Sequence, residues 1–259
     1  MIHYLQKAAA VTALTMSSLA TQAEIFWSDI SITYLYGEDY VQPFFPKGEE
    51  SKGQVYTLEH AGAYNFGKSF FFVDRFNSGD KSINNDDTYM ELGVDLSLSW
   101  LGGTKLENSA IKDLYIATQW ENANPEGFES TDNILAGVGV SWKVPGFVFF
   151  DTNVYYRMNE NTKQNFQLTT AWKLPFAIAS TKWVFSGFFD LTSETETLNG
   201  GFEEPIVFHT QPQLKLDVGD FWGDSDTFYF GVELDYWKNK FGQEGEDQLA
   251  PQLLVQVHF

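Results

Sequence analysis

The sequence predicts an all-β protein, a transmembrane antiparallel up-and-down β-barrel of about twelve strands. Three observations support this fold: apolar residues that recur at every second position, connections that are alternately short and long, and an apolar strand that reaches the last residue. Residues 87–100 show the alternation most clearly, because six apolar side chains there alternate strictly with polar residues or glycine. A helix would instead repeat its apolar stripe every three or four residues.

The first 23 residues have the features of a secretory signal peptide. Lys7 precedes a mostly apolar run over residues 8–19, and small residues follow up to Ala23. We therefore expect cleavage before Glu24, which leaves residues 24–259 as the barrel. The alternative, an N-terminal transmembrane anchor, is weaker because the run is shorter than about 20 apolar residues.

Composition excludes several classes of function. The formal net charge of −19 disfavours nucleic acid as a partner, because phosphate binding requires a basic surface. The chain contains no cysteine, which rules out disulfides, thiolate metal sites and cysteine nucleophiles. Aromatic residues make up 17% of the chain, which argues against disorder despite the charge.

Twelve strands follow from the period-two pattern, and one of them contains Pro212, which cannot donate a hydrogen bond within a sheet. Strands 53–64, 67–77 and 205–218 have the least regular alternation. The expected ranges are 28–36, 53–64, 67–77, 87–100, 111–121, 132–143, 146–157, 164–173, 181–191, 205–218, 226–238 and 249–259.

The connections predict how the barrel closes. Short segments such as "NFG", "VPG" and "LPFAIAS" largely alternate with longer acidic ones, as in outer-membrane barrels. Strand 249–259 should pair with strand 28–36, which removes both sheet edges. The aromatic C-terminus, Phe259, looks like a signal for the outer-membrane assembly machinery, and tryptophans near strand ends should form girdles against lipid. These tryptophans are Trp100, Trp120, Trp142, Trp172 and Trp183. A secreted soluble β-sandwich is the alternative, but it gives no reason for Phe259.

Polar strand faces should line the lumen if the apolar faces meet lipid. The predicted luminal charges include Glu121, Asp190, Asp217, Asp235, Lys143, Arg157, Lys173, Lys182 and Lys215, whereas the alternation does not assign His60, His209 and His258 to one face. An acidic wall disfavours anions, aromatic rings can stack on a base, and carboxylates accept hydrogen bonds from sugar hydroxyls. A nucleoside fits this combination.

The candidate solute-binding residues are Glu59, Asp74, Glu91, Asp95, Asp113, Tyr115, Phe149, Asp151, Tyr155, Phe188, Tyr229, Glu233 and Trp237, with Phe44 and Phe45 as a constriction at the mouth. Two prolines bracket this phenylalanine pair and stiffen it. The alternatives are that the luminal residues only pack the interior, and that the pair packs on neighbouring loops or lipopolysaccharide.

Several stretches resemble one known family. "WSDISITYLYG", "YTLEHAGAYNFGKSFFFVDRFN", "VPGFVFFDTNVYYR", "FHTQPQLKLDVG" and "APQLLVQVHF" are similar to sequences of the Tsx-like, nucleoside-specific channel-forming outer-membrane proteins. The resemblance implies a monomeric barrel, integral to the bacterial outer membrane, that passes nucleosides and deoxynucleosides passively. It implies outer-membrane lipid and lipopolysaccharide as surroundings, and no cofactor.

Other classes of function have less support. An enzyme would need clustered catalytic groups, but no serine-nucleophile motif and no His-Glu-x-x-His metal motif occurs. Glu59 and His60 are adjacent on a strand and therefore point to opposite faces. A structural or adhesive barrel, or a porin for other small polar solutes, remains as the alternative.

Overall fold

The computed structural model describes residues 24–42, 49–78, 86–102, 110–125 and 130–259. These residues form one closed antiparallel barrel whose wall has twelve strand positions. The first nine are β1 (Ile25–Gln42), β2 (Glu49–Tyr64), β3 (Gly67–Ser78), β4 (Asp87–Ser97), β5 (Ile111–Pro125), β6 (Thr131–Trp142), β7 (Phe149–Met158), β8 (Asn165–Ile178) and β9 (Thr181–Thr192). The last three are β12 (Val207–Thr210) with β13 (Gln213–Asp217), then β14 (Phe228–Lys238) and β15 (Gln248–His258).

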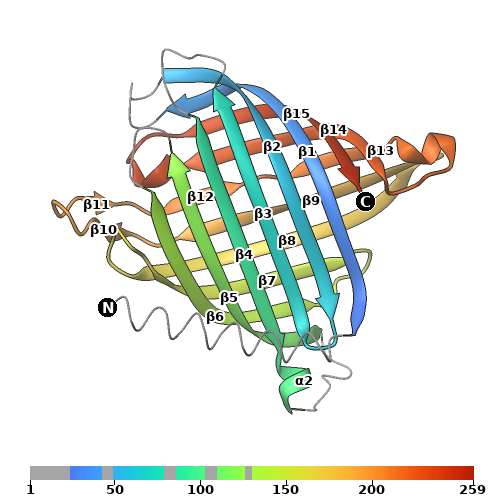
Figure 1. Ribbon diagram of the computed structural model, residues 1–259, viewed down its shortest axis with the longest axis horizontal. Coiled ribbons are helices and arrows are strands. Elements are labelled where there is room, and N and C mark those ends of the chain that lie inside the picture. Colours follow the sequence, from blue (N-terminus) through green and yellow to red (C-terminus); the bar gives the residue numbers. More distant parts are fainter. Residues whose placement is uncertain (1–23, 43–48, 79–85, 103–109, 126–129) are drawn as a thin grey trace.

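The barrel closes between the last strand and the first. β15 pairs with β1 from Ser31–His258 to Gly37–Gln252, and it pairs with β14 on its other side. In Figure 1 the red β15 accordingly lies beside the blue β1. The predicted closure is confirmed. The strand itself ends at His258, and the amide of Phe259 donates to the carbonyl of Ile30 at 2.9 Å.

Strand positions follow the alternation, with four corrections. The strand predicted over 28–36 extends from Ile25 to Gln42, and β8 continues to Ile178 through most of "LPFAIAS", which was predicted as a connection. The strand predicted over 87–100 ends at Ser97, and Trp100 lies in the short helix α2 (Leu98–Gly102). The strand predicted over 205–218 is interrupted at Pro212, so β12 and β13 share one wall position between β9 and β14. Gly187 permits the break, because a Cβ there would lie 2.5 Å from the Gln211 carbonyl oxygen.

The two ends of the barrel differ as expected. We call the end bearing Glu24 and Phe259 the terminal end, and the opposite end the loop end. The described connections over residues 159–164, 193–206 and 239–247 lie at the loop end, where β1, β3 and β5 end and β2, β4 and β6 begin. Among them are the hairpin β10 (Thr195–Glu196) with β11 (Glu203–Glu204) and the turn η2 (Lys240–Gly242). The terminal end carries α2 and the turn η1 (Gly219–Trp222).

The outer wall is apolar and exposed, as a lipid-facing surface requires. Ile32, Ile134, Val138, Phe230 and Leu253 all present nearly half or more of their side-chain surface. Of the predicted girdle, Trp100, Trp120 and Trp142 are exposed, whereas Trp172 and Trp183 are half-buried. Within the described residues, no helix is long and apolar enough to cross a membrane.

Candidate solute pathway

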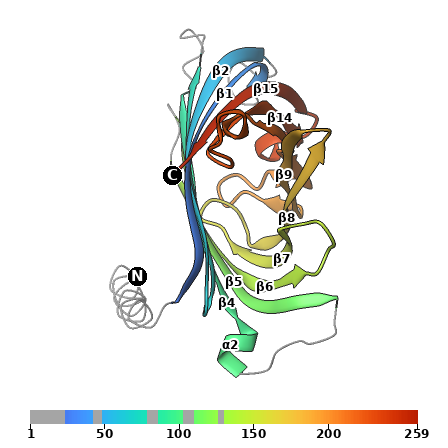
Figure 2. The same ribbon diagram turned by 90° about the vertical axis from the view of Figure 1, so that its right-hand side faces the viewer.

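A cavity of about 2680 Å³ runs through the barrel and is lined by residues from every strand position of the wall. Figure 2 shows β1, β2 and β4 on one side of the barrel and β7, β8 and β9 on the other. The solute-binding candidates that line the cavity are Glu59, Asp74, Glu91, Asp95, Asp113, Tyr115, Phe149, Asp151, Tyr155, Phe188, Tyr229, Glu233 and Trp237. Phe44 and Phe45 lie outside the described residues. The alternation therefore identified the inward face correctly, although contact with solute stays a prediction.

Two predicted luminal charges lie outside this cavity. Asp217 is buried in the β13–β14 connection, where its carboxylate accepts the backbone amides of Asp220 and Asp226. Lys182 is exposed at the terminal end and forms an ion pair with Asp220 at 2.7 Å. Both sit close to a strand end, where the alternating face no longer borders the lumen.

The cavity is acidic, and the charge is uneven along its axis. Seven Lys or Arg side chains against fifteen carboxylates leave a formal charge of −8. By position along their strands, eight carboxylates and two basic residues belong to the half nearer the loop end, which we call the loop half. The other half, the terminal half, has six carboxylates and five lysines, and Glu233 lies at the midpoint of β14. The excess negative charge thus lies mainly in the loop half.

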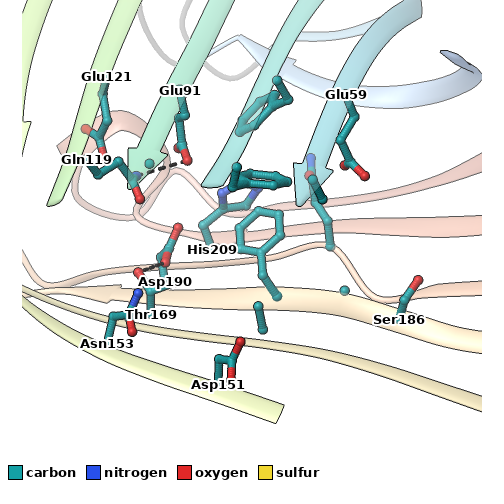
Figure 3. Close-up of a pocket in the computed structure, with 18 of the residues that line it drawn as sticks. Glu59, Glu91, Gln119, Glu121, Asp151, Asn153, Thr169, Ser186, Asp190 and His209 are labelled. Atoms are coloured by element: carbon teal, nitrogen blue, oxygen red, sulfur yellow. Dashed lines mark hydrogen bonds between the residues drawn. The ribbon is translucent and has the colours of Figure 1, made fainter. Parts of the chain in front are cut away.

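Several charges in the loop half are held by internal partners. Arg157 on β7 binds Glu121 on β5 through both guanidinium nitrogens, with Nη1–Oε1 and Nη2–Oε2 distances of 3.1 and 2.7 Å. Glu91 accepts hydrogen bonds from Tyr89 at 2.6 Å and from Gln119 at 2.9 Å. Figure 3 shows Gln119 between the carboxylates of Glu91 and Glu121. A bidentate ion pair, together with carboxylates that each accept two hydrogen bonds, fixes the positions of the charges in this region.

Aromatic rings form a continuous series in the loop half, which we call the ring ladder: Phe188, His209, Trp237 and Phe241. His209 stacks on Trp237 with ring centroids 3.6 Å apart and planes 13° apart. Phe188 meets His209 edge-on at 5.1 Å, and Phe241 meets Trp237 edge-on at 5.2 Å. The ladder therefore runs from β9 across β12 and β14 to η2. It offers ring surface beside an acidic wall.

A hydrogen-bonded network fixes the ladder in place. Asp235 accepts from Gln248 at 2.6 Å and lies 3.1 Å from His209 Nε2. Gln248 also accepts hydrogen bonds from the backbone amide of Val41 at 2.9 Å and from the buried ammonium of Lys240. Phe241 follows Lys240 with φ of 53°, a left-handed conformation that is strained for an aromatic residue. The surrounding contacts thus hold a costly backbone conformation at the mouth.

Acidic groups of different walls approach the centre of the lumen in Figure 3. Asp190 on β9 accepts a 2.5 Å hydrogen bond from Thr169 on β8, and Glu59 lies on the opposite wall. Asp151 on β7 forms an ion pair with Lys68 at 2.7 Å, and the same ammonium lies 4.2 Å from the Tyr115 ring centroid. Within the described residues, no group of three or more His, Asp or Glu side chains can hold a metal ion.

Sequence reasoning missed several members of the pathway. Phe72, Tyr89 and Lys68 line the cavity and share a strand face with the predicted Asp74 and Glu91, so a stricter use of the alternation would have found them. Phe241 lies in a turn, where alternation gives no orientation. The orientation of His209, left uncertain by the sequence, is inward.

Comparison with known proteins agrees with this geometry. The chain is 26% identical to the outer membrane protein OmpK of Vibrio parahaemolyticus serotype O3:K6, over 91% of this chain and 92% of the relative. The NanC porin is a structural neighbour with a TM-score of 0.50 and 11% identity, covering 89% of this chain and 99% of that one. The second likeness bears on the fold alone.

The family comparison is more extensive. The family described as "Nucleoside-specific channel-forming protein, Tsx" matches residues 26–255. Its members are channels, so the prediction of a channel in place of an enzyme is confirmed. This chain is an integral outer-membrane protein that belongs to the nucleoside-specific channel-forming Tsx family.

Proposed function

We propose that this outer-membrane channel passes nucleosides and deoxynucleosides by facilitated diffusion. The observation that carries the proposal is the ring ladder beside Asp190 and Asp235. A nucleobase gains stacking energy on such rings, and ribose hydroxyls donate hydrogen bonds to the carboxylates. A neutral nucleoside also has no phosphate for the acidic loop half to repel.

Passage requires that each contact be weak. A solute enters from the loop end, which faces the outside in barrels of this kind, and moves between ring and carboxylate contacts. It then crosses the terminal half into the periplasm. In this proposal the chain works as a monomer, with lipopolysaccharide and lipid around it and Phe259 presented to the assembly machinery. The signal peptide over residues 1–23 lies outside the described residues and stays a prediction.

Single-channel recording tests the function. The mature chain, residues 24–259, is refolded into a planar bilayer, and uridine or thymidine is titrated into one chamber. Saturable reduction of the current by nucleoside, with ribose alone much less effective, is the expected result. Open pores that ignore nucleoside would keep the channel but replace the solute with other small polar molecules. A folded barrel without pores would favour a structural or adhesive role.

A further inference from the structure

Several charged side chains in the terminal half line the cavity without a counter-ion among the described residues, and one carboxylate and two lysines among them are half-buried or buried. Glu59 on β2, Lys173 on β8 and Lys215 on β13 line the cavity, and none lies within 4.0 Å of an opposite charge among the described residues. Neither Glu59 nor Lys173 makes a side-chain hydrogen bond to any described residue. Charged groups that border a protein interior without partners are costly unless water or a ligand satisfies them.

Lys215 is the most deeply buried of the three. Only 6% of its surface is exposed, and its ammonium donates to the amide oxygen of Gln256 at 2.8 Å. It also lies 5.8 Å from the centroid of the Tyr229 ring. A neutral amide and an aromatic ring orient an ammonium group but do not cancel its charge. The strongest opposite charge acting on Lys215 is that of Glu59, and the reverse also holds.

The three residues are separated around the wall by sign. Lys173 pairs with Ser186 and Lys215 pairs with Val184, so both lysines flank β9 on one side of the lumen. Two strand spacings separate them, about 10 Å. β2 lies six strand positions from β8, diametrically across a twelve-stranded wall, and four positions from β13, so Glu59 lies opposite Lys173 and well separated around the wall from Lys215. The carboxylate of Asp29, also near Glu59, is already bound by His258 at 2.8 Å.

We propose that Glu59, Lys173 and Lys215 form a binding subsite for zwitterionic solutes of the amino-acid class. The ammonium group of the solute lies against Glu59, and its carboxylate lies against the two lysines. A solute that carries both charges satisfies both walls at once, which neither a cation nor an anion does. The subsite adds a solute class to the channel and does not depend on nucleoside passage.

Two other basic residues of the lumen are neutralised by neighbouring carboxylates. Lys68, also in the terminal half, lies 2.7 Å from Asp151 and 3.7 Å from Asp95, so its charge is largely cancelled. Arg157 in the loop half is bound to Glu121 by two hydrogen bonds. Lys68 and Arg157 therefore contribute little to the field across the lumen in comparison with Glu59, Lys173 and Lys215.

Liposome swelling with matched solutes tests the proposal. Alanine and lactamide are isomers of nearly equal size, the first zwitterionic and the second neutral. Lactate and alaninamide supply the corresponding anion and cation. After subtraction of protein-free liposomes, we expect alanine to enter wild-type liposomes about threefold faster than lactamide, with the two single-charge solutes no faster than alanine.

Charge variants identify the residues. Glu59→Gln removes the acidic side of the subsite and should bring the alanine-to-lactamide ratio close to one. Lys173→Gln removes one of the two lysines and should lower the ratio, and neither change breaks a side-chain hydrogen bond to a described residue. The charge reversal Glu59→Lys with Lys173→Glu and Lys215→Glu inverts the field and should restore the preference, because a zwitterion can turn around. Lys163→Gln, an exposed ion-pair residue outside the cavity, is the matched control and should behave as wild type.

The zwitterion subsite and nucleoside passage can be overturned independently of each other. Equal rates for alanine and lactamide in the wild type, or a preference that survives in both single variants, would overturn the proposal. If a variant fails to fold, as judged by its heat-dependent migration on a gel, the wild-type comparison of the four solutes still decides. Uridine block is recorded on the same preparations. Its absence would overturn nucleoside passage alone, whatever the alanine preference.

Discussion

The two halves of the lumen manage charge in different ways. In the loop half, carboxylates outnumber basic residues by eight to two, and both basic residues have fixed hydrogen-bond partners. In the terminal half, six carboxylates face five lysines, yet Lys173 and Lys215 have no carboxylate within ion-pair distance among the described residues. A similar set of residue types therefore gives a rigid acidic vestibule in one half and a field across the lumen in the other.

The difference teaches that alternation alone does not set the properties of a pore. Alternation decides which residues face inward, but register and sheet position decide which of them meet. Glu121 reaches Arg157 across one intervening strand, β6, whereas Glu59 and Lys173 are placed on opposite walls. The following changes probe this contrast, and the largest effect is expected where a charge is most completely buried.

Removing the loop-half ion pair should cost the most stability. The side chains of Arg157 and Glu121 are 13% and 5% exposed, so Arg157→Met leaves a buried carboxylate without its partner. We expect a loss of about 3–5 kcal/mol in the free energy of unfolding. Urea unfolding of the refolded barrel, followed by tryptophan fluorescence, measures it.

An exposed pair provides the control for that change. Lys163 binds Glu196 at 2.6 Å, but the two side chains are 58% and 38% exposed, so Lys163→Met should cost less than about 1 kcal/mol. Equal losses for the two variants would mean that the Arg157–Glu121 pair is solvated and that the loop half is not rigid in the way described.

Truncating the ring ladder should weaken nucleoside binding. Trp237 stacks on His209 and contacts Phe241, so Trp237→Ala removes the central ring of the ladder. Loss of one aromatic stacking partner costs about 1–3 kcal/mol, which corresponds to an increase of roughly tenfold in the nucleoside concentration for half-block. Trp120→Ala, on the lipid face and 37% exposed, should leave that concentration unchanged. A parallel effect of both substitutions would place the solute elsewhere.

The fold and the inward face were predictable because they depend on a period of two. Closure, the number of strand positions and the inward orientation of thirteen candidate residues follow from alternation and chain direction. Where the chain leaves the strand period, prediction failed. Trp100 belongs to α2, Asp217 and Lys182 lie beside the η1 connection, and Phe241 takes its position from a left-handed turn.

Which luminal residues of different strands form ion pairs with one another was not predictable either. Lys68 forms ion pairs with Asp151 and Asp95, whereas Lys173 forms none with a described residue. This difference depends on contacts between residues tens of positions apart in the chain. A single sequence contains no register for such pairs. The sequence thus predicted which residues of the candidate site face inward, but not which of them lie in contact with one another.

Lys240 should make the loop half respond to alkaline pH. Burial lowers the pKa of the Lys240 ammonium to about 8. The unfolded chain, with a lysine pKa near 10.5, then binds more protons between about pH 8 and 10.5, so stability rises as the pH increases through that window. From pH 7 to 8.5 we expect a gain of about 0.8 kcal/mol in docking of the 239–247 connection.

Hydrogen exchange of the backbone amides in that connection measures the gain, after correction for the intrinsic pH dependence of exchange. Lys240→Met should abolish the added protection at pH 8.5. Lys238→Met removes an exposed lysine paired with Asp247 at 2.6 Å, and it should keep the wild-type trend. If Lys240→Met retains the trend, another group is responsible and the buried ammonium does not set the stability of the mouth.

The smallest expected effect bears most directly on the contrast between the two halves. If the loop half sets ion selectivity, then Asp190→Asn should lower the K⁺-to-Cl⁻ permeability ratio by up to about twofold, because it removes one charge of a formal excess of six. Asp113→Asn, the same change in the nearly balanced terminal half, should have less effect, because lysines of that half already compete for Cl⁻. Reversal potentials in a KCl gradient measure both, and Glu38→Gln outside the cavity is the control. A larger shift for Asp113→Asn would move the selectivity filter to the terminal half. The field between Glu59 and the two lysines would then govern inorganic ions as well as zwitterions, and the loop half would be reduced to a vestibule.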